Sequence, residues 1–141
     1  MGQNKNCVFV HFVWATFDRM PIVTDSIERV LYRNISQVCV DDGCEVLAIG
    51  GMPDHVHLLV KLSLTRSCSD LMKHAKGGSS RFVSKELNPG EWFQWQGSYG
   101  AFSVSKRDVP KVIRYIQNQK DHHQDGTVWP EAEESTAEID A

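Results

Sequence analysis

The chain has 141 residues, of which 41% are hydrophobic, and this size suits one domain with its own core better than two. No apolar stretch approaches the roughly 20 residues of a membrane span, and residues 1–6 lack the apolar centre of a signal peptide, so we expect a cytoplasmic protein with no membrane partner. The four cysteines form no Cys-x-x-Cys pair, which favours free thiols over a zinc knuckle.

The net charge of -3 conceals an uneven distribution of charged residues. Residues 1–60 carry 4 basic and 7 acidic side chains, residues 61–114 carry 10 and 4, and residues 115–141 carry 1 and 7. The basic middle segment could contact a polyanion, although a solvated helix face would have the same composition. We expect one domain over residues 1–124, followed by a loose acidic tail over residues 125–141.

The first half of the chain predicts three strands and one helix. Residues 7–16 are apolar on both faces, as a central strand would be. Residues 25–40 carry apolar side chains at helical spacing. Residues 44–49 and residues 55–62 predict two further strands, joined by a glycine-containing turn over residues 50–54.

The second half predicts two helices and one strand. Residues 67–87 and residues 108–123 have helical patterns, residues 88–100 form an aromatic-rich loop, and residues 101–105 predict a short strand. The resulting order of elements is typical of a ferredoxin-like α+β sandwich. In that fold an antiparallel sheet carries two helices on one face, and the last helix can cover the other face, near the strand that begins at residue 55.

Two histidines stand two residues apart at the start of the third predicted strand. Side chains alternate across a strand, so His55 and His57 share one face, while the apolar residues between and after them point to the other. Two imidazoles on one face can chelate a metal ion, although two half-buried, hydrogen-bonded histidines would give the same pattern. We expect the remaining histidines to be structural, surface or helix-terminal residues: His11, His74, His122 and His123.

The final helix places Tyr115 and Gln119 on one flank of its apolar stripe, one turn apart. If this helix covers the histidine face, the amide oxygen of Gln119 could join the histidines around a divalent ion, with Tyr115 beside it as a nucleophile. Both could equally be ordinary rim residues. Tyr32 lies far from the histidines in sequence, and Tyr99 has no glutamine at helical spacing.

Five short motifs, taken together, give the chain a recognisable pattern. They are HFVWAT (residues 11–16), MPDHVHLLV (52–60), KGGSSR (76–81), YGAFSVS (99–105) and YIQNQKDHH (115–123). In this order and spacing the chain resembles the small single-tyrosine HUH transposases of bacterial insertion sequences, including their relatives associated with repeated palindromes. The family fold is the same sheet-and-helix plan that the residue patterns predict.

The resemblance implies a role for each matching residue. His55 and His57 match the metal-binding histidines, Gln119 the third protein ligand, and the ion is magnesium or manganese. Tyr115 matches the nucleophile that forms a 5′-phosphotyrosine link to single-stranded DNA and frees a 3′-hydroxyl. The family also implies DNA with hairpin ends as the partner, and a homodimer in which the tyrosine helix of one subunit can complete the site of the other.

Cationic and aromatic side chains are the candidates for DNA contact. One set of cations lies in the predicted helix over residues 67–87 and another around the tyrosine helix: Lys73, Lys76, Arg81 and Lys85, then Arg107, Lys111 and Arg114. Solvated helix faces would explain them nearly as well. Trp92, Phe93 and Trp95 could stack on bases, although aromatics more often belong to a core.

Two segments depart from the family pattern, and two other functions stay open. Residues 17–20 are less basic than in relatives, and residues 129–141 do not resemble the usual C-terminal extension. The alternatives are a non-catalytic single-stranded nucleic-acid-binding protein and a metal-dependent phosphodiesterase that uses water. The second alternative predicts that Tyr115→Phe stays active, whereas the transposase interpretation predicts complete loss of cleavage.

Overall fold

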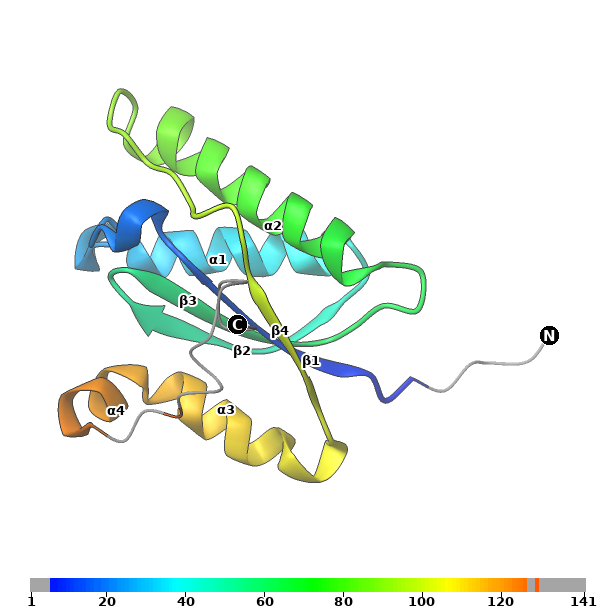
Figure 1. The fold of residues 1–141 in the computed structure, drawn as a ribbon. Coiled ribbons are helices and arrows are strands. Elements are labelled where there is room, and N and C mark those ends of the chain that lie inside the picture. Colours follow the sequence, from blue (N-terminus) through cyan, green and yellow to red (C-terminus); the bar gives the residue numbers. More distant parts are fainter. Residues whose placement is uncertain (1–5, 127–128, 130–141) are drawn as a thin grey trace.

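A four-stranded antiparallel sheet forms the centre of the computed structural model, which describes residues 6–126 and 129 (Figure 1). The strands are β1 (Phe9–Ala15), β2 (Glu45–Met52), β3 (His55–Lys61) and β4 (Gly100–Val104). Their order across the sheet is β2-β3-β1-β4, and each strand runs antiparallel to its neighbours. This is the ferredoxin-like arrangement that the sequence predicts.

Helices cover both faces of the sheet (Figure 1). The longer pair, α1 (Asp25–Asp41) and α2 (Cys68–Phe82), lies on one face, and α3 (Val109–Gln117) and α4 (Gln119–Asp125) lie on the other. Short helical segments are η1 (Phe17–Arg19), η2 (Val83–Leu87) and η3 (Lys106–Asp108). No helix in the described part of the chain has both the length and the apolar character needed to cross a membrane.

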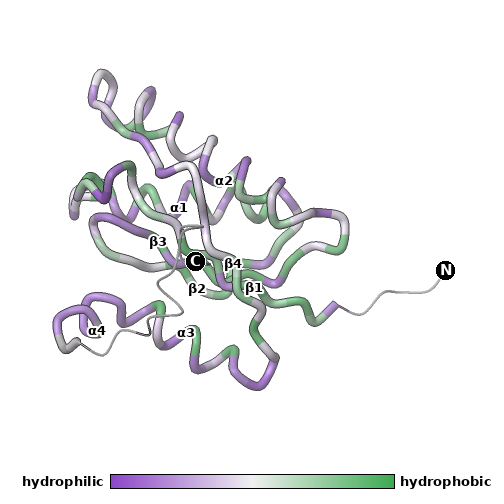
Figure 2. Tube along the Cα trace, in the orientation of Figure 1, coloured by the Kyte–Doolittle hydropathy of each residue, from purple (hydrophilic) through white to green (hydrophobic). Residues whose placement is uncertain are grey.

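The sheet has a separate hydrophobic core on each face. The larger core joins the sheet to α1 and α2, and it contains Trp14 and Leu58, both fully buried. The smaller core joins it to α3 through Leu59, Val112 and Ile116. In Figure 2 the strands are mostly hydrophobic, whereas the helices alternate between hydrophobic and hydrophilic residues. Because side chains alternate across a strand, every second residue of β3 faces α3 and the others face the larger core.

Two boundaries differ from the sequence prediction. Strand β2 runs through Gly50 and Gly51 to Met52, so the predicted turn over residues 50–54 is much shorter. A Cβ atom at Gly50 would lie only 2.4 Å from the carbonyl oxygen of Ile116, so this glycine permits a close approach of strand and helix. The predicted final helix is interrupted at Asn118, whose φ of -108° and ψ of 29° separate α3 from α4.

An ion pair holds the second piece of that helix in place. Lys120 of α4 donates a hydrogen bond of 2.8 Å to Glu28 of α1, which links the two helical layers past the edge of the sheet. The predicted acidic tail over residues 125–141 lies for the most part outside the described residues. Asp125 ends α4, and Trp129 is described separately below.

Candidate active site

The two histidines of β3 point to the face that α3 covers. His55 is 3% exposed and His57 is fully buried, while their neighbour Val56 belongs to the core on the opposite face. The two imidazole rings lie edge to face, with centroids 5.1 Å apart. The shared face that the sequence predicts for these histidines is confirmed, and it forms the floor of a buried polar site between the sheet and the final helices.

Asp54 determines which nitrogen of His55 is available to a ligand. The carboxylate Oδ1 of Asp54 lies 2.7 Å from His55 Nδ1, which donates to it in the neutral tautomer that this pairing favours. The hydrogen bond to His55 lowers the pKa of Asp54, with help from the charge of Arg19 and against the effect of partial burial. The carboxylate therefore stays ionised and directs Nε2 of His55 into the site.

Gln119 meets His55 from the other side. Its Oε1 atom lies 3.3 Å from His55 Nε2 and 3.1 Å from His123 Nε2, and its own amide donates weakly to the carbonyl of Tyr115 at 3.4 Å. With Nδ1 of His55 as donor, Nε2 and Oε1 both present lone pairs to one another. Two hydrogen-bond acceptors can face each other favourably when a proton or a cation lies between them. These two atoms are therefore suited to be ligands of a divalent metal ion.

His11 is a member of the site that the sequence analysis placed among structural or surface residues. Its Nε2 lies 2.8 Å from Nδ1 of His57, and its side chain is buried at 3% exposure. Antiparallel pairing of β1 with β3 sets Val13 opposite His57 and so puts His11 diagonally beside it. His11 thus fixes the ring of His57 as Asp54 fixes the ring of His55, and Nε2 is the nitrogen of His57 that would bind a metal.

His123 was also expected to have only a helix-terminal role. The break at Asn118 turns α4 so that the ring of His123 lies 5.0 Å from that of His55, in addition to its contact with Gln119. Among the described residues, no three or more histidine, cysteine, aspartate or glutamate side chains are grouped to hold a metal ion. The candidate ligands here are instead two imidazoles and an amide oxygen. The amide oxygen suits Mg²⁺ or Mn²⁺ well, whereas the imidazoles are weaker ligands for these ions.

Tyr115 lies deep in the same site. Its side chain is 1% exposed, and its ring meets that of His57 edge to face at 5.8 Å between centroids. Trp129 also stacks on the tyrosine ring, with centroids 3.9 Å apart and planes 10° from parallel. The backbone N–H of Trp129 donates to the hydroxyl of Tyr115 at 3.0 Å, and Lys111 Nζ lies 5.2 Å from the indole centroid. The tyrosine hydroxyl is therefore held in position by the backbone of Trp129.

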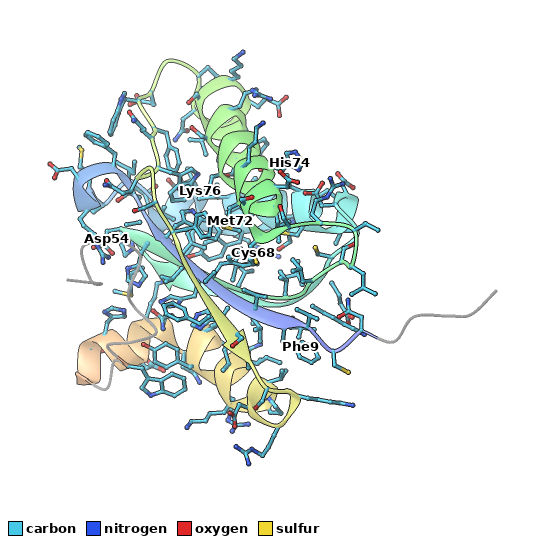
Figure 3. All side chains as sticks on the ribbon, turned by 45° about the vertical axis from the view of Figure 1, so that its right-hand side comes forward. Phe9, Asp54, Cys68, Met72, His74 and Lys76 are labelled. Carbon is cyan, nitrogen blue, oxygen red and sulfur yellow. The ribbon has the colours of Figure 1, made fainter. Side chains whose placement is uncertain are left out.

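The cations predicted for DNA contact separate into two groups. Arg107, Lys111 and Arg114 are exposed on η3 and α3, the elements that carry Tyr115. Lys73, Arg81 and Lys85 are exposed on α2 and η2, on the opposite face of the sheet from α3. Lys76 also lies on α2 (Figure 3), so of these predicted cations only the first group lies on the face of the sheet that carries Tyr115.

Lys76 differs from the other predicted DNA contacts because it binds the chain's own backbone. Its ammonium group donates to the carbonyls of Gln96 at 2.6 Å and Ser98 at 3.1 Å. Burial lowers its pKa to about 8. These contacts fix the segment before β4 onto α2, which is a structural role.

Two of the three predicted stacking residues belong to the core. Phe93 and Trp95 are 7% and 6% exposed, and the indole N–H of Trp95 donates to Ser79 at 2.9 Å. Trp92 is 51% exposed, so it is the residue of this group that can meet a ligand.

The fold and this site together define a small α+β protein with paired histidines on a strand and a tyrosine helix packed over them. A family model described as "Transposase IS200 like" matches residues 4–119, so the chain belongs to the IS200-like transposases and the family resemblance of its motifs is confirmed.

Individual proteins agree with this assignment. The chain is 29% identical over 116 residues to the ISDra2 transposase TnpA of Deinococcus radiodurans, a match that covers 79% of this chain and 83% of that protein. The crystal structure of a putative transposase from Deinococcus radiodurans R1 is 29% identical, with a TM-score of 0.63 over 84% of this chain and 96% of the other. A REP-associated tyrosine transposase bound to a REP hairpin shares the fold, with a TM-score of 0.64 at 18% identity over 99% and 85% of the two chains.

Proposed function

We propose that this transposase cleaves and rejoins single-stranded DNA through a covalent link to Tyr115. The phenol oxygen attacks a backbone phosphorus, a new O–P bond forms, and the bond from phosphorus to the 3′-oxygen breaks. The phenol proton is released and the departing 3′-oxygen takes up a proton. The product is a 5′-phosphotyrosine with a free 3′-hydroxyl, and attack by a 3′-hydroxyl reverses the step to join strands.

The observation that carries this proposal is the convergence of Tyr115, His57, His55 and Gln119 in one buried site. Tyr115 contacts the ring of His57, and Gln119 lies against His55, within a single chain. A phenol with an ordinary pKa of about 10 is a weak nucleophile at neutral pH, so it needs a neighbouring group that makes the phosphate more electrophilic. The paired histidines stand where such a group can be bound.

His55, His57 and Gln119 would hold the divalent metal ion, magnesium or manganese. When bound, the ion polarises a phosphate oxygen and stabilises the negative charge that develops during attack. Asp54 and His11 orient the two imidazoles from outside through hydrogen bonds of 2.7 and 2.8 Å. Trp129 and His57 both contact the tyrosine ring, and these contacts position its hydroxyl before the DNA arrives.

Single-stranded DNA with hairpin ends is the proposed partner. The exposed cations Arg107, Lys111 and Arg114 border the tyrosine helix and support binding of backbone phosphates there. Because one chain supplies the histidines, the glutamine and the tyrosine, we propose a site that can act in cis. We propose a homodimer as the unit of strand transfer, in which two such sites process two DNA ends.

A covalent adduct provides the direct test. Wild-type protein, Tyr115→Phe and the matched control Tyr99→Phe are incubated with Mn²⁺ and end-labelled single-stranded hairpin oligonucleotides from the DNA that flanks the gene. Denaturing gels should show a metal-dependent protein–DNA adduct with the wild type and the control, and none with Tyr115→Phe. Cleavage that persists in Tyr115→Phe would contradict the proposal and indicate a nuclease that uses water.

A further inference from the structure

An exposed pair of aromatic side chains stands next to the active site without a role in the chemistry above. Phe17 follows β1 and Trp92 lies in the loop before β4, and they are 44% and 51% exposed. Their rings meet edge to face, with centroids 5.8 Å apart and planes at 81°. Exposed large aromatics in contact with each other are uncommon on a protein surface unless they bind something. We call this pair the aromatic platform.

Backbone hydrogen bonds join the two segments that carry the aromatic platform. Phe17 N–H donates to the carbonyl of Gln94 at 2.9 Å, and Gln96 N–H donates to that of Ala15 at 2.8 Å, so the two segments pair through a bridge between Thr16 and Trp95, beside the platform. The turn after Phe17 has left-handed backbone at Asp18 and Arg19, with φ of 53° and 55°. Such a conformation in residues other than glycine costs on the order of 1 kcal/mol each and persists where the surrounding contacts enforce it.

The platform is continuous with the active site through the same turn. Thr16, fully buried, bonds with its hydroxyl to the carbonyl of Met20 at 2.6 Å and with its N–H to the carbonyl of Asp54 at 2.9 Å. Arg19 reaches 3.7 Å from the Asp54 carboxylate. A cleft of about 350 Å³ is lined by Arg19 and Pro21 of this turn and by Asp54, His55 and His123, so it extends from the turn to the histidine site.

The charges around the platform favour bases over phosphates as its ligand. Asp18 and Glu91 are exposed beside Phe17 and Trp92, so the platform offers no cationic track for a phosphate backbone. Base stacking on an aromatic ring needs no positive charge, and Arg19 can contribute a guanidinium plane at the border with the cleft. Duplex DNA keeps its bases stacked internally, whereas a single strand can present them to protein rings.

We propose that Phe17 and Trp92 bind unpaired bases of the single strand next to the phosphate that enters the histidine site. This assignment rests on the proposed function, because it names the part of the DNA substrate that extends out of that site. A strand anchored at the platform enters the cleft beside Arg19 and reaches His55. The platform thereby positions the strand and does not take part in bond cleavage.

Binding of bases can be separated from binding of phosphates with two strands of equal charge. The full chain and its Trp92→Ala and Phe17→Ala variants are titrated by fluorescence anisotropy with a labelled 30-nucleotide single strand of mixed sequence and with an abasic strand of the same length. Each substitution is expected to raise the Kd for the base-containing strand by about fivefold or more, since stacking on one aromatic side chain contributes at least that factor. Neither should change the Kd for the abasic strand or the salt dependence of binding.

Two control variants define what counts as a specific effect. Trp92→Phe keeps an aromatic ring and should bind within about twofold of the wild type. Leu64→Ala removes a side chain that is 55% exposed and belongs to neither segment, so it should not change the Kd. Unchanged binding by Trp92→Ala, an equal loss on the abasic strand, or a wild type that does not prefer the base-containing strand would each overturn the proposal.

The outcome is independent of the test of Tyr115. An adduct on Tyr115 with unchanged binding by Trp92→Ala would refute the platform and leave the proposed function intact. Base-dependent binding that needs Trp92, without any adduct, would support the platform and count against the covalent mechanism.

Discussion

Gly50 is a point of close contact between β2 and α3, and we expect it to control the position of the tyrosine. It pairs with His57 across the sheet, so it lies on the face that α3 covers. A Cβ atom there would lie 2.4 Å from the carbonyl oxygen of Ile116, whereas real contacts of this kind stay above 3.0 Å. Gly50→Ala must therefore move α3 away from the sheet by about 0.6 Å or more.

This displacement should affect both stability and activity. Overpacking of this kind costs about 1–3 kcal/mol of the free energy of unfolding, because backbone on both sides resists the shift. Tyr115 precedes Ile116 in α3, and Gln119 begins α4 three residues after Ile116, so both should shift relative to His57 and His55. A misplacement approaching 1 Å can reduce the rate of a positioned reaction by on the order of 100-fold.

Gly77→Ala provides the matched control. Gly77 lies in α2, and a Cβ atom there meets nothing within 4 Å. This substitution should raise the free energy of unfolding by up to about 1 kcal/mol, because alanine is the better helix former. Urea denaturation gives the stabilities and the rate of adduct formation gives the activities. If Gly50→Ala were as stable and as active as Gly77→Ala, the close packing of α3 on β2 would be refuted.

Three further predictions concern the site and its supports. Asp54→Asn removes the carboxylate that orients the ring of His55. It should raise the Mn²⁺ concentration needed for half-maximal adduct formation by about 10- to 100-fold, and an unchanged concentration would count against this orienting role. Trp129→Ala should slow adduct formation because the ring of Tyr115 loses the stacked indole that positions it, whereas an unchanged or faster reaction would count against this positioning role. Burial lowers the pKa of Lys76 from 10.5 to about 8, so between these values the unfolded chain binds more protons than the folded one. The free energy of unfolding of the wild type, relative to Lys76→Met, should therefore rise as the pH increases from 8 to 10.5, and a flat difference in urea titrations would contradict the burial of this ammonium group.

Local periodicity was enough to predict most of the fold and the relative placement of the candidate site residues. Alternation in β3 assigns His55 and His57 to one face, and helical spacing puts Tyr115 and Gln119 one turn apart. Both properties depend on neighbours within a few residues, so a single sequence contains them. The same is true of α1 and α2, whose apolar stripes repeat at helical spacing.

The features that were missed depend on contacts between distant segments. His11 joins the site through the register of β1 on β3, which the residues of β1 alone do not specify. Gly50 resembles a turn residue in sequence, but it serves a close approach to α3. Lys76 and Trp95 have the composition of a DNA-binding surface, yet each finds a hydrogen-bond partner within the fold. Composition alone does not show whether a side chain binds a ligand or another segment of the same chain.

The most direct test of the mechanism is to locate the DNA on the protein. The adduct formed with Mn²⁺ is trimmed with nuclease, digested with trypsin and analysed by mass spectrometry. Cleavage after Arg114 and Lys120 yields a peptide in which Tyr115 is the one tyrosine. The covalent mechanism predicts a nucleotide mass on this peptide, attached to Tyr115. A nucleotide on a peptide that contains Tyr32 or Tyr99, or DNA cleaved without any modified peptide, would contradict it.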